Sequence, residues 1–207
     1  MERYMSAFQY RDFTLIWLGS LFGHSAYWAL IVARGVLVLN LTNSATSVGI
    51  VTFAAMMPRF VVPPVAGYLS DRFTRRKLLV ASYTINLLLG FMLAILVFNG
   101  DVKVWQLAIL SVLDGSSRTF QITASQALVP NLIPKSILNN AVAINYATVH
   151  GSRLIGPGII APLMMMDSPG YPFLAAALFY GFSLIVVSCI RTQSTGGIEK
   201  GQGVAPL

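Results

Sequence analysis

The apolar residues of this chain occur in long blocks rather than in the narrow stripes of a soluble helix. A block of about 20 apolar residues matches the hydrocarbon thickness of a bilayer, because an α-helix rises about 1.5 Å per residue. Of the 207 residues, 56% are hydrophobic and only 10% are charged, whereas soluble domains carry about 25% charged residues. The pattern therefore predicts an all-α integral membrane protein that crosses the bilayer several times.

Short polar stretches divide the apolar residues into six blocks. Residues 1–12 are polar and are expected to form a cytoplasmic N-terminus, and the Gly-rich tail at 191–207 is typical of a flexible cytoplasmic linker. Residues 129–140 contain two prolines and one lysine and are expected to lie along the membrane surface. The expected transmembrane helices cover residues 13–41, 47–69, 78–98, 104–128, 141–166 and 172–190, which together form a bundle at 13–190.

The cations of the loops indicate which side of the membrane each loop occupies. Six spans place both termini on the same side, and the segments of that side hold nine cations, whereas the opposite loops hold Lys103 alone. Because cytoplasmic loops carry an excess of lysine and arginine, we expect both termini in the cytoplasm and the protein in the cell (inner) membrane. The nine cations are Arg3, Arg11, Arg72, Arg75, Arg76, Lys77, Lys135, Arg191 and Lys200.

Several classes of function find no support in the sequence. Cys189 is the only cysteine, which excludes an internal disulfide and a C-x-x-C metal or redox site. No Ser/His/Asp grouping, metal-spaced histidine cluster or phosphate-binding glycine loop is visible, so we expect neither an enzyme nor a bound cofactor or metal. Loop cations that set topology explain the net charge of +7 better than nucleic acid binding does.

One charged stretch, GYLSDRFTRRKLL at residues 67–79, separates two apolar blocks. The placement of cations in cytoplasmic loops explains the lysine and arginines of this stretch, but it does not explain Asp71 or Gly67. The stretch resembles the signature G-x-L-(S/A)-D-R-x-G-R-R-(K/R) of the major facilitator superfamily, which occupies the same loop in that family. Thr74 stands where the family usually has glycine. The matching residues are Gly67, Leu69, Ser70, Asp71, Arg72, Arg75, Arg76 and Lys77.

This resemblance implies both a fold and a role for the loop. The chain would be one half of a twelve-helix fold, with six transmembrane helices arranged as two inverted three-helix repeats. In the family the charged cluster holds the two halves together, which makes Asp71 a latch and Arg72, Arg75 and Arg76 its supporting charges. A carboxylate at a helix end can meet the positive N-terminal end of a neighbouring helix. The alternative is a loop that sets topology and contacts anionic lipids.

Two further stretches resemble the same superfamily. SRLIGPGIIAP in the fifth block resembles the antiporter signature G-x-x-x-G-P-x-x-G-G through Gly156 and Pro157. Small residues let helices approach closely and proline permits a bend, so these two residues are expected to form a helix-bend motif, with an ordinary packing helix as the alternative. Residues 125–145 resemble the segment that joins the fourth and fifth spans in a subgroup including bacterial siderophore and macrolide exporters.

Five ionisable residues lie within the apolar blocks, where each costs about 2.5 to 3.5 kcal/mol on insertion scales. Asp114 and Arg118 are four residues apart, so they share a helix face and can pair. This pair is the first candidate for a proton-coupling site, and a purely structural ion pair is the alternative. Arg34 is expected near the outer end of a long first helix, where it can snorkel to the interface. Arg59 and Arg153 are expected to lie deeper, where they could attract an anionic substrate or pair with Asp114.

Together these observations predict the N-terminal half of a secondary transporter that exports small molecules, with protons as the coupling ion. Its substrate would bind between this bundle and a second six-helix bundle, from the same full-length chain or from a second copy, within the lipid bilayer. A membrane scaffold or binding protein that transports nothing, or a truncated fragment without function, is the alternative. His24 is expected to be a hydrogen-bonding core residue rather than a proton carrier.

Overall fold

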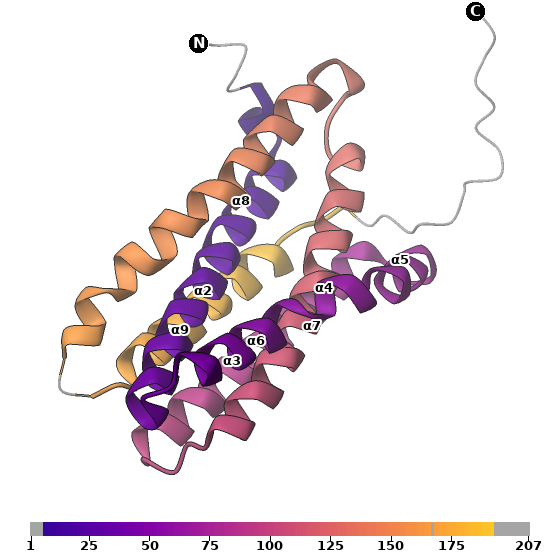
Figure 1. Ribbon diagram of the computed structural model, residues 1–207. Helices are drawn as coiled ribbons and strands as arrows, with labels where there is room; N and C mark the ends of the chain where they lie inside the picture. Colours follow the sequence, from indigo (N-terminus) through magenta and orange to yellow (C-terminus); the bar gives the residue numbers. More distant parts are fainter. Residues whose placement is uncertain (1–5, 167, 193–207) are drawn as a thin grey trace, which may run out of the picture.

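The computed structural model describes residues 6–166 and 168–192, which fold into α-helices and short 3-10 helices (Figure 1). The expected linker falls mostly on residues 193–207, and the start of the expected N-terminus on residues 1–5, outside the described residues. The long helices are α2 (Arg11–Thr42), α6 (Arg75–Phe98), α7 (Val104–Leu128), α8 (Leu138–Ile160) and α9 (Tyr171–Ser188). The shorter elements are η1 (Ser6–Gln9), α3 (Ala45–Met56), α4 (Pro58–Val61), α5 (Pro63–Arg72), η2 (Val129–Asn131), η3 (Lys135–Ile137) and η4 (Pro162–Met165).

Local capping signals explain the turn between the first two apolar blocks. Asn43 adopts the left-handed conformation with φ of 50°, and its N–H donates to the carbonyl oxygen of Leu39, which ends α2. Asparagine tolerates this conformation better than most residues. The side chain of Ser44 then accepts a hydrogen bond from the N–H of Ser47 and starts α3.

Prolines interrupt two of the expected spans. The expected helix at 47–69 is broken into α3, α4 and α5, and its axis bends by 51° between Ala45–Val61 and Pro63–Arg72. Pro58 and Pro63 open α4 and α5, because a proline ring donates no hydrogen bond and clashes with the preceding turn. For the same reason α8 ends at Ile160, earlier than the expected residue 166, since Pro162 opens η4.

Among the described residues, α2, α6 and α9 are long and apolar enough to cross a membrane, and the bent α3–α5 segment would make a fourth span. α7 and α8 have 25 and 23 residues, enough to span a bilayer, but they are more polar. In α7 most of the polar side chains face the interior of the bundle. These buried side chains are Ser111, Asp114, Ser117, Arg118, Thr119, Gln121 and Ser125. The expectation of six spans stays a prediction.

The helices pack in the same pattern in both halves of the chain. α2 packs against α8 and α9, whereas α7 packs against α3–α5 and α6. α6 and α9, the last long helix of each half, also pack against each other. These contacts therefore stay in place when α2 is exchanged with α7, α3–α5 with α8, and α6 with α9, whereas the packing of α2 against α3 has no equally close counterpart between α7 and α8. Figure 1 shows α8 running along α2 on one side of the bundle.

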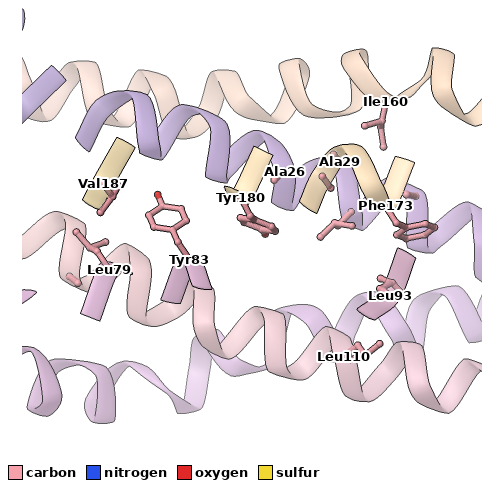
Figure 2. Close-up of a cluster of buried hydrophobic side chains, with 14 of the residues drawn as sticks. Ala26, Ala29, Leu79, Tyr83, Leu93, Leu110, Ile160, Phe173, Tyr180 and Val187 are labelled. Carbon is pink, nitrogen blue, oxygen red and sulfur yellow. The ribbon is translucent and has the colours of Figure 1, made fainter. Parts of the chain in front are cut away.

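The hydrophobic core lies between these helices and is continuous from one end of the bundle towards the other (Figure 2). Each of the five long helices contributes buried side chains to it. Tyr83 and Tyr180 lie in this core, although each carries a hydroxyl group that needs a partner. The residues labelled in Figure 2 are Ala26, Ala29, Leu79, Tyr83, Leu93, Leu110, Ile160, Phe173, Tyr180 and Val187.

Two glycines allow helix backbones to touch. A Cβ atom at Gly156 of α8 would overlap the carbonyl oxygen of Ser25 in α2, and one at Gly115 of α7 would overlap the carbonyl oxygen of Ala55 in α3. Small residues play this part in membranes because helix association there depends on close van der Waals packing. Pro157, the other residue of the expected helix-bend motif, lies inside α8.

Gly156→Ala is expected to destabilise the fold by about 1–3 kcal/mol, because the added methyl group pushes α8 away from α2. Denaturant unfolding of the detergent-solubilised chain, followed by circular dichroism, measures the change. Gly158→Ala is the matched control, since a Cβ at Gly158 on the same helix meets nothing within 4 Å. Equal effects of the two substitutions would show that the close approach of α8 to α2 is not what Gly156 provides.

Candidate functional site

Asp114 lies at the centre of the bundle and holds three helices together. Its Oδ2 atom forms an ion pair with NH1 of Arg34 at 3.1 Å, and its Oδ1 atom accepts a hydrogen bond from the Tyr180 hydroxyl at 3.3 Å. Arg34 is 2% exposed and Asp114 is 0% exposed. The charged side chains therefore neutralise each other out of reach of bulk solvent, and they join α2, α7 and α9.

This ion pair corrects two expectations. Asp114 pairs with Arg34 rather than with Arg118, although Asp114 and Arg118 share a face of α7. Arg34 does not snorkel to an interface, because α2 is surrounded by α3, α7, α8 and α9, which leaves Arg34 inside the bundle. Spacing along one helix shows which side chains can meet, but here the partner comes from a different helix.

A small cavity adjoins the Arg34 side chain. It has a volume of about 10 Å³ and is lined in part by Arg34, Thr52 and Ser111. Within the described residues, Nε and NH2 of Arg34 and the hydroxyl of Ser111 have no hydrogen-bond partner. A polar cavity of about this size has room for one water molecule with several hydrogen-bonding partners.

Arg118 lies in a different environment on the same helix. It is 2% exposed, and its guanidinium carbon lies 3.7 Å from the centre of the Tyr27 ring. Its NH1 atom is 3.4 Å from Nδ1 of His24. His24 is buried in the core, as expected. The ring face of Tyr27 stabilises the cation by a cation–π interaction, and within the described part of the chain Arg118 forms no ion pair.

Arg59 and Arg153 lie at the surface of this chain, so the expected pairing with Asp114 is not found among the described residues, while their depth in the membrane stays a prediction. Both are exposed, and neither is paired with Asp114 within the described residues. The guanidinium carbon of Arg59 lies 5.9 Å from the centre of the Tyr27 ring, and that of Arg153 lies 4.9 Å from the centre of the Trp28 ring. Both arginines therefore flank the same part of α2 from neighbouring helices.

A second polar connection crosses the core near the Arg118 turn. The side-chain amide of Gln121 donates to the Tyr83 hydroxyl at 2.8 Å, and this hydroxyl donates to the carbonyl oxygen of Gly19 at 2.9 Å. The two bonds connect α7, α6 and α2. Sequence reasoning missed the roles of Tyr83 and Tyr180, although a tyrosine in an apolar block is itself a signal that its hydroxyl needs a partner.

The charged loop at residues 67–77 binds the ends of other helices. NH1 of Arg75 donates to the carbonyl oxygen of Ala127, in the last turn of α7, at 2.6 Å. NH2 of Arg76 donates to the carbonyl oxygen of Ser188, the last residue of α9, at 2.6 Å. Cations near helix C-termini bind unsatisfied carbonyl groups and oppose the negative end of the helix dipole.

The other signature residues of this loop face outward or pack locally. Asp71 is exposed at the end of α5 and forms no ion pair within the part of the chain that the structure describes. The guanidinium carbon of Arg72 lies 4.5 Å from the centre of the Tyr68 ring. Lys77 is exposed, Leu69 is half-buried, and a Cβ at Gly67 would meet nothing within 4 Å. The structure thus gives Arg75 and Arg76 partners on α7 and α9.

Metal ligands are not grouped in the described residues, where no three His, Cys, Asp or Glu side chains come together to hold an ion.

Comparison with known proteins places these features in context. The sequence model of a family described as transmembrane secretion effector matches residues 4–197. A staphyloferrin A transporter of Staphylococcus aureus is 23% identical over 171 residues, which are 82% of this chain and 43% of that protein. Macrolide efflux protein A of Streptococcus pyogenes is 25% identical over 122 residues, which are 59% of this chain and 30% of that protein. The chain therefore spans less than half the length of these relatives.

The ion pair at the centre of the bundle is expected to dominate the energetics of α7. Arg34→Gln or Asp114→Asn alone should destabilise the fold by about 3–5 kcal/mol, because each leaves a buried group without its partner. The double substitution should lower the free energy of unfolding by less than the sum of the two single substitutions. A double-mutant cycle in denaturant unfolding measures this coupling. The same cycle between Asp114 and Arg118 is the control, and a larger coupling there would contradict the observed pairing.

Arg75 and Arg76 are expected to stabilise the helix ends that they contact. Arg75→Gln and Arg76→Gln should each lower the free energy of unfolding by about 0.3–1 kcal/mol, as is typical of cations at helix C-termini. Thermal unfolding in detergent is the measurement. Lys77→Gln removes a charge from the same loop but from an exposed side chain, so it should change stability less. An equal loss in all three variants would indicate that only the total charge of the loop matters.

Proposed function

We propose a function from the family of this chain, which belongs to the transmembrane secretion effector family of the major facilitator superfamily. In this proposal the chain forms one half of a proton-coupled exporter of small molecules. The staphyloferrin A transporter and the macrolide efflux protein among its relatives support transport as the function. The buried ion pair between Arg34 and Asp114 is the observation that carries the proposal. Ionisable side chains are rare inside membrane helices and mark ion or substrate pathways.

The proposed architecture is six transmembrane helices in two inverted three-helix repeats. The exchange symmetry of the helix contacts supports it, since α2, α3–α5 and α6 pack as α7, α8 and α9 do. Such a bundle provides one wall of a transport pathway, and a second six-helix bundle provides the other. We propose that this bundle belongs to the same full-length chain or to a second copy. Both termini would lie in the cytoplasm, with the protein in the cell membrane.

The proposed coupling step is proton binding to Asp114. A proton that reaches an Asp114 carboxylate oxygen neutralises the side chain and removes the counter-charge of Arg34. An unpaired buried cation is strongly unfavourable, so the protonated form would favour a different helix arrangement in which Arg34 finds water or another partner. The small cavity beside Arg34, where Thr52 and Ser111 also line the wall, offers a water position next to the pair, and the Tyr180 hydroxyl would hold the carboxyl group in place.

The proposed gate is Asp71, in the loop that resembles the superfamily signature. Its carboxylate is exposed, while Arg75 and Arg76 of the same loop bind the ends of α7 and α9. The Asp71 carboxylate is therefore available to a partner that approaches the end of α5. The positive N-terminal end of a helix in the second bundle is a suitable partner, and alternating access would make and break that contact.

Asp114→Asn is expected to abolish gradient-driven transport per folded molecule. Because the same substitution also destabilises the bundle, uptake is normalised to the amount of folded protein in the membrane. Everted membrane vesicles with an acidic interior provide the assay, with carboxyfluorescein, rhodamine 6G and Nile red as anionic, cationic and neutral probe dyes. We expect uptake of at least one dye that stops when the proton gradient is collapsed and that is missing in Asp114→Asn. Asp101→Asn is the matched control, because Asp101 is exposed in the connection between α6 and α7. Undiminished gradient-driven uptake by Asp114→Asn would remove Asp114 from the coupling mechanism.

A further inference from the structure

Five side chains form an arginine–aromatic cluster around the middle of α2: Tyr27, Trp28, Arg59, Arg118 and Arg153. The rings of Tyr27 and Trp28 contact each other edge to face, with centres 5.6 Å apart. The guanidinium groups of Arg59 and Arg118 lie over Tyr27, and that of Arg153 lies over Trp28. The arginines come from α4, α7 and α8, so three helices direct cations to one place on α2.

No arginine of this cluster forms an ion pair among the described residues, where the single ion pair joins Arg34 to Asp114. The charge of Asp114 also acts on Arg118, but it is already engaged by Arg34, and the direct contacts of the Arg118 guanidinium group are with the Tyr27 ring and His24. Arg118 is 2% exposed, and a cation inside the membrane is costly unless it meets an opposite charge or water. A bound anion would supply that charge.

The cluster also contains hydrogen-bond donors that no described residue satisfies. The Tyr27 hydroxyl, the indole Nε1 of Trp28 and Nε of Arg118 are buried and have no partner there. The indole and guanidinium nitrogens can only donate. A ligand that satisfies them must therefore accept hydrogen bonds. An ionised carboxylate does so with two oxygens and about four lone-pair positions, and its planar shape matches the guanidinium group.

We propose that the arginine–aromatic cluster binds the carboxylate of an organic anion, and that this anion is the transported molecule. The proposal rests on the export function proposed above. Arg59 and Arg153 are exposed and attract the anion to the site, whereas buried Arg118 binds the carboxylate directly. The half-buried Trp28 provides an apolar surface for the rest of the molecule. Coupling and substrate binding then use different arginines, Arg34 and Arg118.

The test compares an anion with its neutral analogue in the full chain, purified into lipid nanodiscs. Trp17→Phe and Trp105→Phe make Trp28 the only tryptophan, since the chain has three. 2-Iodobenzoate, which quenches tryptophan by contact, is expected to quench Trp28 saturably, and 2-iodobenzamide to bind at least about tenfold more weakly, as for loss of one charge-assisted interaction. Arg59→Gln and Arg153→Gln should each weaken iodobenzoate binding several-fold, and Arg118→Gln should weaken it most.

Arg59 and Arg153 are exposed, so their substitution tests the site without the folding defect that loss of buried Arg118 can bring. Arg11→Gln removes an exposed cation at the start of α2 and should leave binding unchanged. Equal affinity for the two iodo compounds, or unchanged affinity in both Arg59→Gln and Arg153→Gln, would overturn the anion site.

Binding in nanodiscs needs no proton gradient, which separates this proposal from the export function. Saturable iodobenzoate binding without gradient-driven uptake of any probe dye would overturn export and leave the anion site in place. Gradient-driven uptake of rhodamine 6G, with no discrimination between iodobenzoate and iodobenzamide, would overturn the anion site alone.

Discussion

The ion pair between Arg34 and Asp114 is the interaction on which the rest of the bundle depends. It brings two opposite charges together out of reach of bulk solvent, and the Tyr180 hydroxyl adds a hydrogen bond from a third helix. Neither charge could remain in this place alone. The pair therefore sets the rotation of α2 against α7, and this in turn decides which side chains of both helices face the core and which face outward.

Besides the hydrophobic core, the helices are joined by polar bonds to backbone carbonyls and by close approaches at small residues. Arg75, Arg76 and Tyr83 each donate to a carbonyl oxygen on another helix, while Gly115 and Gly156 bring backbones into contact. In a bilayer, lipid tails are as apolar as the helix surfaces, so helices gain little by hiding apolar area from lipid. Hydrogen bonds between helices and close backbone contacts therefore supply much of the stability of a helix bundle in a bilayer.

Arg34 and Arg118 are both buried, but within the described residues only Arg34 has an acidic partner in contact with it. The position of Asp114 on α7 therefore gives neighbouring turns of this helix different roles. Asp114 neutralises Arg34, so Arg118, one turn further along α7, remains cationic beside Tyr27. In the proposed mechanism the neutral pair responds to protons and the cationic cluster responds to substrate. Their separation by a single helical turn lets a change at one site move the helix that carries the other.

The sequence by itself determined the helical membrane class, the superfamily signature in the loop, the bounds of α7 and the presence of charges inside apolar blocks. These properties depend on local composition and spacing, which the letters show directly. Only the tertiary structure decided that Asp114 pairs with Arg34 across helices, that Arg59 and Arg153 lie at the surface, and that Arg75 and Arg76 bind the ends of α7 and α9. Partner choice depends on which side chains of different helices face each other, and residues such as Arg34 and Asp114 are 80 positions apart in the chain, so local spacing does not reveal it.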